Sequence, residues 1–94
     1  MRKKIKGYAL INSEGDYLEF EQVDSNDIEV YATDNIDEAM IFDTYTDASE
    51  TGYDVRYGTG EWNYCAFTIP TDIVKVKKYI EVDKVGKVVG KRQK

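Results

Sequence analysis

The sequence predicts a small α+β domain with a mostly antiparallel sheet of four to five strands and two short helices. Its 94 residues fit one domain. Several short segments alternate apolar and polar residues, which is typical of strands, and two short segments carry helix-capping patterns. Aromatic residues make up 13% of the chain, which argues against disorder. We expect residues 1–86 to form the domain and residues 87–94 to form a flexible basic tail.

The first three predicted strands lie near the N-terminus. Residues 4–12 are apolar on both faces, which favours a central strand. A turn around Gly15 joins them to residues 17–22 and predicts a β-hairpin. Residues 28–32 predict a third, shorter strand. In residues 17–22 and 28–32, the side chains expected to face the core are Leu18, Phe20, Ile28, Val30 and Ala32.

Two capping patterns predict the helices. Asn35 as N-cap with Glu38 three residues later opens a short helical turn. Residues 41–45 then form a short strand or an extended connector. The segment Asp47–Glu50 repeats the capping pattern, and Gly52 predicts the C-terminal stop of the second helix.

Two further strands are expected in the C-terminal half. Residues 61–69 alternate, and Pro70 ends this strand or places it at a sheet edge. Residues 74–82 form the last strand. We expect Cys65 to be a small buried hydrophobic residue, because free cysteines are commonly buried. The two faces of the first of these strands are Trp62, Tyr64 and Ala66 on one side and Cys65, Phe67 and Ile69 on the other.

Charge is unevenly distributed along the chain. Residues 7–72 hold sixteen acidic side chains and one basic one, a net charge of −15. Residues 1–6 hold four basic and no acidic side chains, and residues 73–94 hold eight basic and two acidic ones. The acidic segment repels nucleic acid and attracts cationic surfaces. We therefore expect a basic protein surface as partner, with direct nucleic-acid contact limited to the basic tail.

The motifs that would indicate catalysis or a cofactor are incomplete. The chain has no histidine and one cysteine, so a cysteine–histidine pair is impossible. Gly58–Asn63 resembles the start of a dinucleotide fingerprint, but the third glycine is replaced and a strand follows. The oxygen-rich residues 24–29 lack the glycine and donor spacing of an EF-hand calcium loop. We expect no enzyme activity, cofactor or metal, although a small enzyme of unknown reaction remains an alternative.

The N-terminus suggests a cytoplasmic protein. Residues 1–6 are basic, but no long apolar run follows them as in a signal peptide. No run is long enough to span a membrane.

The candidate partner-binding residues combine carboxylates with aromatic rings, since tyrosine and tryptophan are enriched at protein–protein hot spots. They are Glu19, Glu21, Asp24, Asp27, Glu29, Tyr31, Asp43, Tyr45, Tyr57 and Trp62. Two other interpretations stay open. The acidic surface can serve only to keep the chain soluble, or the chain can self-associate through aromatic side chains and edge strands.

One resemblance narrows the function. The strings Gly7–Asn12 and Glu14–Leu18, followed by Thr33-Asp34, Ala39 and Phe42, then Asp47-Ala48, resemble small phage and prophage proteins of Gram-positive bacteria. The likeness covers roughly residues 5–50. It implies expression inside a bacterial host and, for an acidic member, a DNA-mimic inhibitor of a host nuclease, such as an anti-CRISPR protein. No catalytic residue carries over. The alternative within this group is an accessory or structural phage protein.

Overall fold

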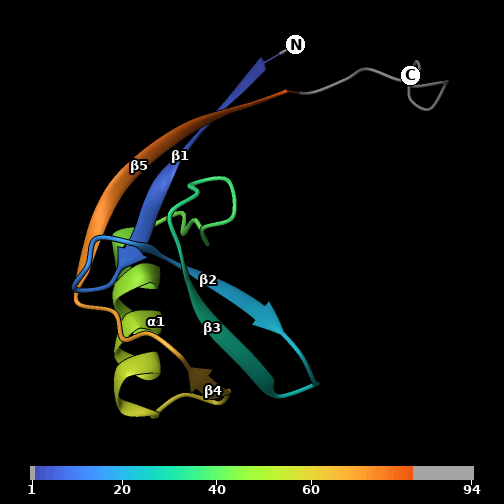
Figure 1. The fold of residues 1–94 in the computed structure, drawn as a ribbon, viewed down its shortest axis with the longest axis vertical. Helices are drawn as coiled ribbons and strands as arrows, with labels where there is room; N and C mark the ends of the chain where they lie inside the picture. Colours follow the sequence, from blue (N-terminus) through green and yellow to red (C-terminus); the bar gives the residue numbers. More distant parts are fainter. Residues whose placement is uncertain (1, 82–94) are drawn as a thin grey trace, which may run out of the picture.

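The computed structural model describes residues 2–81, which form a five-stranded sheet and one helix (Figure 1). The elements are β1 (Arg2–Ile11), β2 (Tyr17–Gln22), β3 (Asp27–Thr33), α1 (Tyr45–Tyr57), β4 (Asn63–Ala66) and β5 (Asp72–Glu81). The strand order is β4-β3-β2-β1-β5. Three neighbouring pairs are antiparallel and the pair β3–β4 is parallel, so the sheet is mixed. The predicted α+β class is confirmed, and the predicted tail lies outside the described residues.

Strands β1 and β2 are joined only near their hairpin turn. Their register pairs Ile11 with Tyr17, and beyond this point the two strands diverge (Figure 1). Asn12 fixes the turn, because its Oδ1 accepts hydrogen bonds from the backbone N–H groups of Glu14 and Asp16, both at 3.0 Å. Its Nδ2 donates to Thr68 Oγ1 at 2.8 Å. Both the oxygen and the nitrogen of the buried Asn12 amide are thus hydrogen-bonded, as is usual for buried polar groups.

The connector between β3 and α1 occupies the space between these diverging strands. Phe42 and Tyr8 exchange two backbone hydrogen bonds of 2.8 Å, which form an antiparallel bridge. The Met40 N–H donates to the carbonyl of Leu18 in β2 at 3.1 Å. At Gly7, a Cβ atom would lie 2.4 Å from the Phe42 carbonyl oxygen, so only glycine permits this approach.

The prediction of two short helices is wrong for the described residues, which contain one helix. Thr44 caps α1, with its Oγ1 accepting from the Asp47 N–H at 3.1 Å, and Gly58 ends it in the left-handed conformation. Gly52 is therefore inside the helix and not its stop. Around Asn35 the chain forms only turns, although its Oδ1 accepts from the Asp37 N–H at 2.9 Å as an N-cap does. From Met40 onward the backbone bonds to β2 and β1 and does not continue as a helix.

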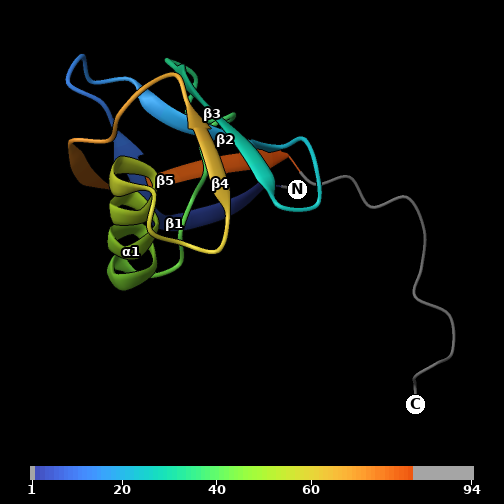
Figure 2. The same ribbon diagram turned by 90° about the horizontal axis from the view of Figure 1, so that it is seen from below.

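The core lies between α1 and one face of the sheet. The buried cluster is Leu10, Leu18, Val30, Phe42, Ala48 and Val55. Figure 2 shows α1 on one side of the strands. Within residues 2–81 no second helix covers the opposite face. The predicted inward positions of Leu18 and Val30 are confirmed, whereas Ala32, near the end of β3, is exposed. One covered and one open face is a common arrangement for antiparallel sheets.

Candidate functional site

The uncovered side of β2, β3 and β4 carries the strongest concentration of predicted partner-binding residues. Side chains alternate along a strand. Since Leu18 and Val30 are buried against α1, the residues next to them face the other way. We call this surface the open sheet face. Its members are Glu19, Glu21, Asp27, Glu29, Tyr31, Cys65 and Phe67.

The strand register brings like charges together on the open sheet face. Glu21 is paired directly with Glu29, and Glu19 with Tyr31. Opposed like charges on neighbouring strands are destabilising by up to about 1 kcal/mol. None of the lysine and arginine side chains that the structure describes, those of Lys4, Lys6, Arg56, Lys75 and Lys77, forms an ion pair with these carboxylates. The surface therefore holds negative charge that the described part of the chain does not neutralise.

Two aromatic rings lie on the same face. Tyr31 stacks on Phe67, with ring centroids 5.3 Å apart and planes 9° from parallel. Phe67 is 64% exposed, so most of its ring is available to a partner. The stack places an apolar surface beside the carboxylates.

The Tyr31 hydroxyl is tied to this acidic group. It donates a hydrogen bond to Glu29 Oε1. This bond, then burial, then the charge of Glu29 raise the pKa of Tyr31 to about 12. Tyr31 is therefore a protonated donor at neutral pH. The hydrogen bond also holds the Glu29 carboxylate on the open sheet face.

The ten predicted residues divide between several places. Five of them lie on the open sheet face, namely Glu19, Glu21, Asp27, Glu29 and Tyr31. Asp24 lies beside it in the β2–β3 turn, where its Oδ1 accepts from the Ser25 N–H at 2.7 Å. Trp62 is half-buried in the loop before β4.

The remaining three residues surround α1 and do not join the group. Tyr45 contacts Tyr8 edge-on, with ring centroids 6.0 Å apart. Asp43 lines a groove of the β1–β5 pair. Tyr57, at the end of α1, packs against Tyr53, with ring centroids 4.7 Å apart.

Two members of the open sheet face were not among the predicted partner-binding residues. The alternation of β4 correctly separates Cys65 and Phe67 from Tyr64 and Ala66. The expectation that Cys65 is buried is wrong, because its side of the sheet has no covering layer. Alternation groups Phe67 with Cys65 in the sequence, but it does not indicate which group faces α1.

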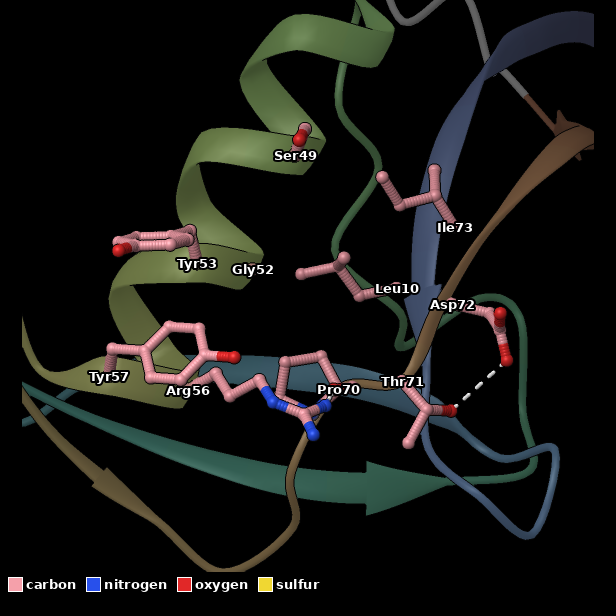
Figure 3. A pocket seen from close by; sticks show the side chains of 10 residues that line it. All are labelled: Leu10, Ser49, Gly52, Tyr53, Arg56, Tyr57, Pro70, Thr71, Asp72 and Ile73. Carbon is pink, nitrogen blue, oxygen red and sulfur yellow. Dashed lines mark hydrogen bonds between the residues drawn. The ribbon is translucent and has the colours of Figure 1, made fainter.

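A second hollow lies between α1 and the start of β5 (Figure 3). It measures about 200 Å³ and is lined by apolar side chains such as Leu10 and by the rings of Tyr53 and Tyr57. Arg56 closes one end, with its Nη1 donating to the Pro70 carbonyl at 2.9 Å. This guanidinium joins α1 to the chain entering β5, which is a structural role.

Two kinds of feature were sought among the described residues, a cluster of metal ligands and a membrane-spanning helix. No three carboxylate or thiol side chains within residues 2–81 lie close enough together to hold a metal ion. No helix in this part of the chain is long and apolar enough to cross a membrane. Comparison with known proteins gave no matching family model, curated protein or solved structure.

Proposed function

We propose that this chain is a non-catalytic binding protein whose open sheet face occupies the basic, nucleic-acid-binding surface of another protein. The observation that carries the proposal is the pairing of Glu21 with Glu29 on an uncovered face, without a neutralising cation in the described part of the chain. A lysine or arginine of the partner relieves that repulsion when it lies between the two carboxylates.

The geometry of the face suits a surface that normally holds a nucleic-acid backbone. Glu19 and Glu21 repeat along one strand at about 6.7 Å, and neighbouring strands are about 4.8 Å apart. The result is a two-dimensional array of carboxylates, which can replace phosphates in a channel of lysine and arginine. The Tyr31–Phe67 stack supplies an apolar surface that becomes buried when the partner binds, as in the core of protein interfaces.

The biological role that follows is inhibition. With the resemblance of residues 5–50 to small phage proteins, the proposed partner is a host or defence protein that binds nucleic acid, such as a CRISPR nuclease. The inhibitor competes with nucleic acid for one surface in the cytoplasm of the host. It needs no cofactor, since competition requires only binding.

The experiment compares two charge-matched triple variants in capture from a bacterial lysate. The face variant is Glu19→Lys/Glu21→Lys/Glu29→Lys. The control variant is Glu14→Lys/Glu50→Lys/Glu61→Lys, at exposed positions that are not members of the face and with the same change in net charge.

We expect the wild type and the control to enrich the same nucleic-acid-binding proteins, identified by mass spectrometry, and the face variant to lose them. An equal loss of capture in both variants shows that overall charge, and not this face, is responsible. That result contradicts the proposal.

Self-association is the second candidate. The specific observation in its favour is the exposure of large apolar side chains, including Phe67 at 64% and Tyr79 at 51%. Strand β5 also has no paired neighbour on its outer side among the described strands. Sedimentation that shows concentration-dependent dimers insensitive to salt supports an accessory or structural role. A monomer at all concentrations excludes this role.

A further inference from the structure

The β1–β5 pair has a second charged surface of the opposite sign. Lys4 and Lys6 alternate on one face of β1, and Lys75 and Lys77 alternate on β5. The register pairs Lys6 with Lys77, and it places the other two lysines opposite tyrosines. We call the surface formed by Lys4, Lys6, Tyr8, Lys75, Lys77 and Tyr79 the lysine face.

The lysine face continues the covered side of the sheet beyond the end of the core. Leu10, near the end of β1, is paired with Ile73, near the start of β5, and this end of the strand pair packs on the core. Further along, the pair extends away from α1 (Figure 1), and lysines take the positions that core residues held. The lysine face and the open sheet face thus belong to opposite sides of the sheet.

The arrangement of these lysines destabilises the β1–β5 pair, and the described residues do not offset this loss of stability. Lys6 and Lys77 are directly opposite each other, and opposed like charges destabilise a strand pair. All four lysines are exposed, and none forms an ion pair with a side chain that the structure describes. Even Asp43, which lines the same groove, does not form one.

Aromatic rings accompany the lysines. The groove on this surface is lined by Lys6, Tyr8, Lys75 and Lys77. Tyr79, paired with Lys4, is 51% exposed. Tyr8 is half-buried, so Tyr79 is the exposed ring of this surface. A positively charged groove beside an exposed aromatic ring is a combination that binds single-stranded nucleic acid, since lysines contact the backbone and a base stacks on the ring.

We propose that the lysine face binds single-stranded nucleic acid. The four lysines contact phosphates, and Tyr79 stacks on a base. This goes beyond the proposed function and does not depend on it, because the two surfaces share no residue and bind partners of opposite charge.

Fluorescence anisotropy with a short labelled oligothymidylate tests the proposal. Four phosphate contacts predict a slope of about −2.8 for log K against log salt on a single strand. The variant Lys6→Gln/Lys77→Gln is expected to halve that slope to about −1.4 and to weaken binding about tenfold or more. The control Lys91→Gln/Lys94→Gln makes the same charge change outside the described residues and is expected to leave the slope near the wild-type value.

Substitution of Tyr79 separates stacking from charge. Tyr79→Ala is expected to weaken oligothymidylate binding about tenfold, and Tyr79→Phe to restore it, because both Tyr and Phe offer a ring. Circular dichroism checks that each variant is folded.

Three outcomes overturn the proposal. The first is wild-type protein that fails to bind the oligonucleotide at low salt. The second is a loss of binding in the Lys91/Lys94 control but not in the Lys6/Lys77 variant, which assigns the binding to the C-terminal segment. The third is self-association that the Lys6/Lys77 variant abolishes without any oligonucleotide binding, which makes a second copy the occupant of the lysine face.

Discussion

At the scale of single residues, Glu29 is the most connected member of the open sheet face. It is paired with Glu21 on one side and with Cys65 on the other, and it accepts a hydrogen bond from Tyr31. The hydroxyl stabilises the carboxylate where the strand register otherwise places it against a second negative charge. Tyr31 thus links the charged and aromatic parts of the face.

The first prediction concerns the titration of Tyr31. Glu29→Gln removes the charged acceptor, so the pKa of Tyr31 falls from about 12 toward the ordinary value of 10. An NMR titration of the Tyr31 ring measures it. Because the folded-state pKa exceeds the unfolded-state value, the stability contributed by this group is complete below about pH 10. It declines as the pH rises to about 12.

A control separates Tyr31 from the other groups that titrate at high pH. Tyr31→Phe has no hydroxyl, so its stability is expected to fall less steeply than that of the wild type between about pH 10 and pH 12. Identical slopes for the two proteins show that the hydrogen bond to Glu29 has no influence on the titration.

The second prediction concerns Gly7. In Gly7→Ala the new Cβ meets the Phe42 carbonyl oxygen at 2.4 Å and the Ile41 Cγ2 atom at 2.7 Å. Because the first contact is with backbone, we expect a loss of about 1–3 kcal/mol in unfolding free energy, measured by chemical denaturation. In Gly60→Ala the nearest atom is the carboxylate end of Asp54, which can move, so this control is expected to lose less.

At the scale of elements, the sequence predicts correctly those features that depend on one segment alone, and it fails for those that depend on contacts with distant segments. The alternation that turns Leu18 inward is a property of β2 alone, and it was predicted correctly. Gly52 was misread as a helix stop because its role depends on Leu10 in a distant strand, whose Cδ2 lies 3.0 Å from the position of a Cβ. Asn35 and Thr44 both open capping patterns, but the chain after Asn35 soon bonds to the sheet in extended form at Met40 and Phe42, whereas the residues after Thr44 form a helix that packs on the sheet.

The third prediction tests the start of α1. Thr44→Ala removes the side chain that accepts from the Asp47 N–H, and we expect a loss of about 1 kcal/mol in unfolding free energy. Thr46→Ala is the matched control, because Thr46 is exposed inside the same helix and does not cap it. The control is expected to be neutral or slightly stabilising, since alanine favours helix more than threonine does. An equal loss in both variants contradicts the assignment of Thr44 as the cap.

At the scale of the whole molecule, the fold converts a charge pattern along the chain into two surfaces. The sequence shows that residues 7–72 are acidic and that both ends are basic. It does not show that β1 pairs with β5, which gathers lysines from the two ends. Nor does it show that β4 joins β3 in parallel, which brings Phe67 beside Tyr31. Both depend on pairings between segments far apart in the chain, which local patterns do not encode.

The same limit explains which candidate residues were grouped correctly. Glu19, Glu21 and Glu29 belong to one hairpin, where the register of two neighbouring strands is enough to place them together. Tyr45 and Tyr57 were chosen for their residue type alone, and the fold places them at the two ends of α1. The sequence therefore predicts the carboxylates of the face and Tyr31, but it does not predict that Phe67 lies beside them or where the face ends.

The measurement that tests the central claim most directly is displacement of nucleic acid from the protein captured through the open sheet face. The captured protein is loaded with labelled duplex DNA, and the release of DNA is followed as the wild type or a triple variant is added over a series of salt concentrations. We predict release by the wild type and by the Glu14/Glu50/Glu61 control, no release by the Glu19/Glu21/Glu29 variant, and weaker competition as salt rises. Simultaneous binding of DNA and the wild-type chain to the captured protein would contradict the account.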